Sequence, residues 1–186
     1  PPEIFGLHDN ANLTKDQNET TGLFTDIIAT RTGGGGGGGG FDEVLVNNIA
    51  NDILAKLPPD FDQELAGNKY PTDPMESMNT VLKQELIRFV KLTSTMRSSL
   101  KQLQLAMKGQ VVMSAELDAV AGSMAIGTVP DMWDGVSYPN LKPLAAYMTD
   151  LWERLEFFQS WIDNGAPVCF WFSGFFFQPS FMTGTL

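Results

Sequence analysis

Residues 75–108 read MESMNTVLKQELIRFVKLTSTMRSSLKQLQLAMK, and this stretch decides the fold. Apolar residues recur along it at the spacing of one helix face. The stripe comprises Met78, Leu82, Leu86 (or Glu85), Phe89, Met96, Leu100, Leu103 and Met107. At 1.5 Å of rise per residue, the helix would be about 50 Å long. Gly109 supplies its C-cap. One long amphipathic helix is therefore expected to organise the domain.

The outer positions of this helix are basic. They carry Lys83, Arg88, Lys91, Arg97, Lys101 and Lys108, against only Glu76 and Glu85. Because the whole chain has a formal charge of −10, this face could complement the acidic remainder of the same domain. Basic stems also cover apolar surface while their heads stay in water. A docking stripe for an acidic partner is the alternative, and both readings stay open at this point.

Shorter periodic segments predict a mainly α fold of about five or six helices in an irregular bundle. Asp42 and Glu43 favour a helix that Pro58 stops, and Ser114 caps another that ends before Gly127. We further expect an irregular crossing over 60–74, a loop over 130–139, a long helix from 141–143 to 164–165, and a last helix opened by Pro179.

Residues 164–186 carry no charged side chain and seven of the chain's aromatic residues. So dense an apolar segment must be covered by a core or by another surface. We expect one short apolar extended segment near 167–177, a buried strand packed on the helices around 148–162. Cys169 within it is predicted to be a buried, inert thiol. The position of this apolar segment at the end of the chain suggests that the chain is a piece cut from a larger protein.

Eight consecutive glycines divide the chain. We expect a connector over 1–13, a short helix over 14–32, a flexible polyglycine linker over 33–40, and a helical portion over 41–186. Whether the glycines are native or engineered stays open.

The composition excludes several classes of function. The charge of −10 and the pI near 4.4 argue against nucleic acid or an anionic membrane as the main partner. A single cysteine excludes an intrachain disulfide and favours a reducing compartment. The apolar run 168–177 is about half as long as the ~20 residues that a spanning helix needs.

No set of residues predicts a catalytic, cofactor or metal site. The glycine run lacks the Gly-Lys-Ser/Thr of a phosphate-binding loop, since Phe41 follows it. His8 is the only histidine, and no cysteine cluster supplies further ligands. The carboxylates of Glu116 and Asp118 are two residues apart, a spacing that points them to different faces of a helix. A small enzyme is therefore disfavoured.

Several segments resemble the C-terminal domain of dynein heavy chains. They include PEIFGLHDNA at 2–11, SMNTVL at 77–82, RSSL at 97–100, MSAEL at 113–117, VPDMW at 129–133, SYPNLKPL at 137–144 and WIDNG at 161–165. FWFSGFFF at 170–177 is most similar to the axonemal branch of that family. The chain departs from the family pattern at Gln178-Pro179-Ser180, where Thr-Gln-small is usual.

The resemblance implies the N-terminal helical part of the domain that follows the sixth AAA+ module, packed on the motor ring. Its role would be structural and regulatory, without a catalytic residue or a bound cofactor, because ATP is hydrolysed in earlier modules of that family. The partners implied are the rest of the heavy chain, including the ring and a missing C-terminal part. Microtubules would be met only indirectly, and nucleic acid and membranes not at all. The implied location is cytoplasmic, in a ciliary or flagellar axoneme.

Two sets of side chains are predicted to form the interface with the ring or a partner. They are the basic residues Lys83, Arg88, Lys91 and Arg97 and the aromatic residues Phe175, Phe176, Phe177 and Phe181. The alternative function is a free-standing helical adaptor that binds an acidic helix of another protein.

Overall fold

The computed structural model describes residues 17–18, 20–24, 42–73 and 75–184. Contacts divide the chain into two units, Pro1–Gly40 and Phe41–Leu186. In the first unit, residues 17–18 and 20–24 are helical. The expected connector, the polyglycine linker and the rest of the expected helix over 14–32 lie outside the described residues.

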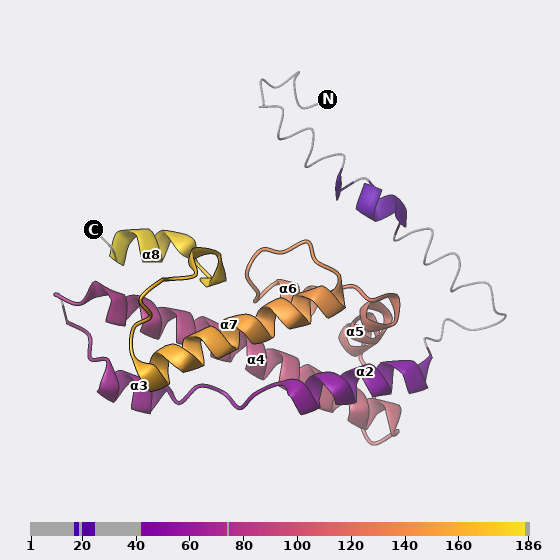
Figure 1. Ribbon diagram of the computed structural model, residues 1–186. Coiled ribbons are helices and arrows are strands. Elements are labelled where there is room, and N and C mark those ends of the chain that lie inside the picture. The colour runs from indigo at the N-terminus through magenta and orange to yellow at the C-terminus, as the bar shows by residue number, and fades with distance from the viewer. Residues whose placement is uncertain (1–16, 19, 25–41, 74, 185–186) are drawn as a thin grey trace. The chain divides into compact units, whose positions relative to one another are not determined.

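The second unit is helical, as Figure 1 shows. Its elements are α2 (Glu43–Lys56), α3 (Gln63–Lys69), α4 (Ser77–Met107), α5 (Ala115–Ile126), α6 (Asp131–Asp134), α7 (Leu144–Asn164), the 3-10 turn η2 (Phe172–Gly174) and α8 (Gln178–Gly184). Within 42–73 and 75–184 there is no β-strand. The prediction of a mainly α fold is confirmed.

The helix boundaries follow from local chemistry. The side chain of Asp42 accepts the N–H groups of Val44 and Leu45 and so caps α2. The N–H of Leu117 donates to Ser114 Oγ at 3.2 Å and starts α5. Gly109 follows α4 with a φ of +71°, a left-handed conformation that glycine adopts without strain. The expected caps therefore form at these three helices.

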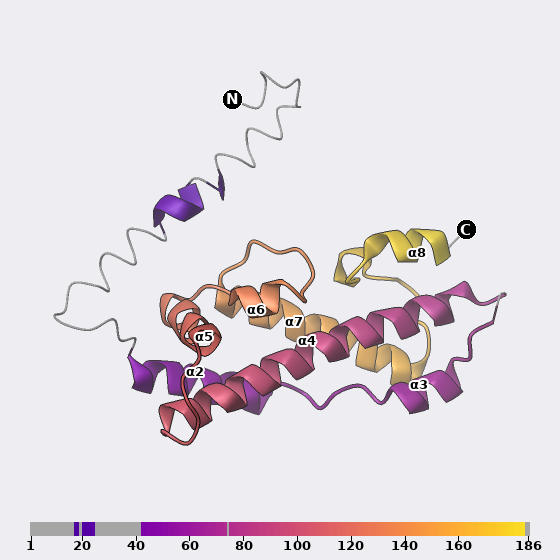
Figure 2. The ribbon, with the colours of Figure 1, turned by 180° about the vertical axis from the view of Figure 1, so that it is seen from behind.

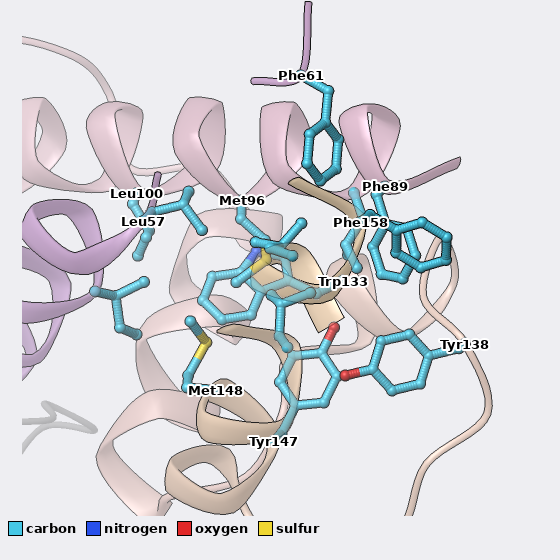
Figure 3. Packing of buried hydrophobic residues seen from close by; sticks show 14 of the residues in the cluster. Leu57, Phe61, Phe89, Met96, Leu100, Trp133, Tyr138, Tyr147, Met148 and Phe158 are labelled. Carbon is cyan, nitrogen blue, oxygen red and sulfur yellow. The ribbon is translucent and has the colours of Figure 1, made fainter. Parts of the chain in front are cut away.

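The core lies between α4 and α7, which lie side by side in both ribbon views (Figure 2). The rings of Phe89 on α4 and Phe158 on α7 have centroids 5.2 Å apart. Trp133 on α6 enters the same core (Figure 3). Its Nε1 donates to Ser99 Oγ at 2.9 Å. The buried side chains of Figure 3 thus join helices that are distant in sequence.

Two short helices correct the sequence prediction. The segment 60–74, expected to be an irregular crossing, contains α3, whose N-terminus is capped by Asp62 accepting the N–H of Leu65 at 2.9 Å. The segment 130–139, expected to be a loop, contains α6. Both helices are short, so neither shows the repeated apolar spacing that reveals α4.

The strand expected near 167–177 is not formed. A 3-10 turn, η2, occupies residues 172–174 instead, and bends and irregular backbone surround it. A strand would need a partner for its backbone groups, and the described part of the unit contains no other strand that could pair with it. The backbone is bound by side chains from the helices, as described below.

Candidate functional site

The residues after α7, 165–184, are named the C-terminal segment. They begin where side chains at the end of α3 bind the last turn of α7. Lys69 Nζ donates to the carbonyl oxygens of Ile162 at 2.5 Å and Asp163 at 2.7 Å. The hydroxyl of Tyr70 donates to the carbonyl of Trp161 at 2.8 Å. The last carbonyls of a helix have no partner within it, and these side chains supply one. The positive charge of Lys69 also interacts favourably with the negative end of the helix dipole. The exit of the chain from α7 is therefore fixed.

Aromatic rings then fold the segment back onto α7. The ring centroid of Phe170 lies 5.1 Å from that of Trp161 and 5.3 Å from that of Phe181 on α8. Phe175 is fully buried, and its ring lies 5.5 Å from Phe158. The Phe170–Trp161 and Phe175–Phe158 contacts are edge-to-face, and such contacts add to the hydrophobic stabilisation that comes from burial.

A buried carboxylate on α4 binds the backbone of this segment. Glu85 has no exposed surface, and it accepts the N–H of Phe176 and, at 3.2 Å, the N–H of Phe177. Arg88 Nη1 also donates to Glu85, at 2.8 Å. Burial raises the pKa of Glu85 above its ordinary value, although the two N–H groups and Arg88 act in the opposite direction.

An arginine on α7 holds the other side of the same backbone. Arg154 Nη1 donates to the carbonyl of Phe175 at 3.4 Å, and its Nε donates to Asp150 at 2.7 Å. The guanidinium lies 3.9 Å from the ring centroid of Tyr138 and 5.4 Å from that of Trp171. Burial favours a higher pKa for Asp150, but hydrogen bonds from Lys142 and Arg154 outweigh it and lower the pKa.

We name Glu85 and Arg154, together with the residues 175–177 that they hold, the C-terminal clasp. Glu85 accepts from N–H groups and Arg154 donates to a carbonyl, so both charged groups are compensated where they are buried. The clasp connects α4 and α7 through a segment about 90 residues downstream of Glu85.

The predicted interface residues divide into two groups. Phe175 is fully buried in the core of the unit. Arg97 binds Asp60 at 2.8 Å and the carbonyl of Pro58 at 2.7 Å within the unit. Phe176 and Phe181 are half-buried.

The other predicted interface residues remain accessible. Lys83 and Lys91 are exposed. The guanidinium of Arg88 lies 5.2 Å from the ring centroid of Phe177, which is 48% exposed. That these residues contact the AAA+ ring or a partner protein stays a prediction.

The structure decides the position of Glu85 and corrects that of Cys169. Glu85, which the sequence places either on the apolar stripe beside Leu86 or among the outer charges, is buried on the inner face of the helix. Its spacing from Leu82 and Phe89, three and four residues away, is the signal for the stripe position. Cys169, predicted to be buried, is exposed. Its neighbour Val168 is exposed as well, because the segment turns outward before Phe170 returns to the core.

The described surface has a groove beside the C-terminal segment. A groove of about 510 Å³ lies between α4 and α8, and Asp73 is the one carboxylate among the residues that line it. Among the described residues, no group of three or more His, Cys, Asp or Glu is arranged to hold a metal ion. No helix in this part of the chain is both long and apolar enough to span a membrane.

The chain matches a known family over most of its length. A family model described as the C-terminal domain of the dynein heavy chain matches residues 17–186. Dynein axonemal heavy chain 3 of Mus musculus is 55% identical over 98% of this chain, and dynein axonemal heavy chain 12 of Homo sapiens is 49% identical over 100%. Dynein axonemal heavy chain 1 of Rattus norvegicus is 50% identical over 100%. The chain spans only 4% to 6% of the length of these relatives. It belongs to the family of C-terminal domains of dynein heavy chains, and these relatives are of the axonemal type.

Proposed function

We propose that this chain is a non-catalytic structural and regulatory segment of a dynein heavy chain, packed on the AAA+ ring of an ATP-driven microtubule motor. Its partner is the rest of the heavy chain, and it meets the microtubule only indirectly. The axonemal names of its relatives support a place in the axoneme of cilia or flagella. Membership of the family favours this role over that of a free-standing adaptor.

The C-terminal clasp is the observation that carries the proposal. It ties α8 and the 3-10 turn to α4 and α7, while Lys69 and Tyr70 tie α3 to the end of α7. Close-packed elements joined in this way transmit displacement instead of absorbing it. A segment with this construction suits the bracing of ring modules against one another.

The charged residues buried in the unit have structural partners. The buried charged residues of the described part are engaged in structural contacts. Glu85 binds backbone N–H groups, and Asp150 binds Arg154 and Lys142.

The experiment uses a full-length axonemal heavy chain that contains this segment. Glu85→Ala opens the clasp, and Glu156→Gln, an exposed carboxylate on α7, is the matched control. We expect Glu85→Ala to reduce microtubule gliding velocity while nucleotide binding by the ring is unchanged. Glu156→Gln should behave as the wild type. Unchanged gliding by a Glu85→Ala motor whose C-terminal segment has lost its hydrogen-exchange protection would refute the proposed role.

A further inference from the structure

The outer face of α4 is a continuous row of exposed residues. At 100° per residue they fall within about 40° of one line along the helix. The row, which we name the α4 outer stripe, consists of Lys83, Ile87, Lys91, Ser94, Ser98, Lys101 and Leu105. From its first to its last residue it measures about 33 Å.

The three lysines of the stripe have no acidic neighbour on their own helix. The positions three and four residues before and after each of them hold no Asp or Glu. In the described part of the chain, no ion pair involves Lys83, Lys91 or Lys101. Opposite charges at these spacings support a solvent-exposed helix. The chain forms one at Lys56, which binds Asp52 four residues away at 2.8 Å. The charges of these three lysines are therefore not compensated by an ion pair within the described part of the chain.

Apolar side chains lie between these lysines. Ile87 is 54% exposed and stands four residues from both Lys83 and Lys91. Leu105 is 38% exposed and stands four residues after Lys101. The two apolar residues are 18 positions apart, five full turns, so they project from the same side of the helix about 27 Å from each other.

Both edges of the stripe are already occupied by the unit itself. On one edge, Arg97 binds Asp60 and the carbonyl of Pro58 in the connection between α2 and α3. On the other edge, Arg88 lies against the ring of Phe177, which the clasp positions. The α4 outer stripe lies between these two edges. The C-terminal segment contributes to one of them through Phe177.

We propose that the α4 outer stripe docks an acidic segment of the AAA+ ring of the same heavy chain, a segment whose apolar side chains rest on Ile87 and Leu105. This inference rests on the proposed function and names the chemistry of the partner. Carboxylates of the partner compensate Lys83, Lys91 and Lys101, and complementary charge sets the register of the two elements. A phosphate backbone would need a more basic protein than one with a net charge of −10.

The test places a photoreactive benzoylphenylalanine in the full-length heavy chain, in separate variants at Ile87, Val112 or Leu141. Val112 and Leu141 are exposed apolar residues outside the stripe. We expect the probe at Ile87 to form a crosslink with an Asp- or Glu-rich segment of the ring. The double variant K83E/K91E should reduce the crosslink yield roughly tenfold, since reversing two exposed charge pairs costs about 1.4 kcal/mol. The charge-conserving control K83R/K91R should retain the yield.

Each other outcome overturns the inference in a recognisable way. If Val112 or Leu141 crosslinks to the ring and Ile87 does not, the proposed function stands and the docking stripe is wrong. If no position reaches the ring, both fail. A crosslink from Ile87 to tubulin, or to a ring segment without carboxylates, contradicts the stated partner. A yield unchanged by K83E/K91E contradicts the role of charge.

Discussion

The carboxylate of Glu85 accepts the backbone N–H of Phe176, 91 positions further along the chain. A buried acid on the longest helix thus replaces the strand partner that an extended segment would need. Because Glu85 is fully buried and accepts a second N–H, from Phe177, the segment 175–177 belongs to the core of the unit.

Glu85→Ala is expected to destabilise the unit strongly. It leaves the N–H groups of Phe176 and Phe177 without an acceptor and removes the partner of Arg88. We expect a loss of about 2–4 kcal/mol in the free energy of unfolding. Urea unfolding followed by circular dichroism measures it. Glu156→Gln, at an exposed position, should change this free energy by less than about 0.5 kcal/mol. Equal unfolding midpoints for the wild type and Glu85→Ala would contradict the claim that the clasp stabilises the unit.

The raised pKa of Glu85 predicts a pH dependence with a definite sign. Above the ordinary value of 4.5, the unfolded chain has released this proton while the folded chain still retains it. The wild type therefore loses unfolding free energy as the pH rises from about 4.5 through the folded-state pKa. Glu85→Gln lacks the ionisable group and does not show this loss.

The comparison isolates Glu85 from the other acids. Asp150 has a lowered pKa and so contributes the opposite slope, a loss of stability as the pH falls. It is present in both proteins, and its effect cancels when the free energy of Glu85→Gln is subtracted from that of the wild type. This difference should decrease as the pH rises. A difference that increases with pH would mean that the pKa of Glu85 is lowered on folding.

Gly174 is predicted to tolerate no side chain. A Cβ added there would lie 2.6 Å from the ring of Trp171, which packs beside Arg154. Gly174→Ala should lower the free energy of unfolding by about 1–3 kcal/mol, because the ring must shift. Gly122→Ala is the matched control, since its added Cβ meets nothing within 4 Å in α5. It should stabilise the helix by about 0.5–1 kcal/mol. Equal effects of the two substitutions would contradict the packing of η2.

Cys169 is expected to react in the native protein. The residue is exposed, in a turn where Val168 is exposed as well. A thiol reagent such as dithionitrobenzoate should therefore modify it completely without denaturant. The absorbance of the released thiolate measures the extent of reaction. A requirement for urea would indicate that the thiol is buried after all.

Long periodic segments were predictable, and the segments without a repeat were not. α4 and α7 have 31 and 21 residues, and each shows an apolar stripe that identifies it. α3 has seven residues and buries only Ala66, so no stripe exists to be found. Its capping residue Asp62 is visible in the sequence, but a cap alone is a weak signal.

The C-terminal site depends on tertiary structure that no local pattern encodes. In a run of aromatic residues every position is apolar, so periodicity cannot separate the buried Phe175 from the half-exposed Phe177. The choice is made by Glu85 and Arg154, which bind the backbone from two distant helices. The sequence predicts that the apolar segment must be covered. It does not predict that Glu85 and Arg154 bind its backbone.

Hydrogen exchange at the amides of Phe176 and Phe177 tests the clasp most directly. Both N–H groups donate to a buried carboxylate, so in the wild type they should exchange as slowly as the amides of the α4 core. In Glu85→Ala they should exchange at nearly the rate of an unstructured chain, while the amides around Phe89 and Phe158 stay protected. Rapid exchange at Phe176 and Phe177 in the wild type would contradict the central claim that α4 holds the C-terminal segment.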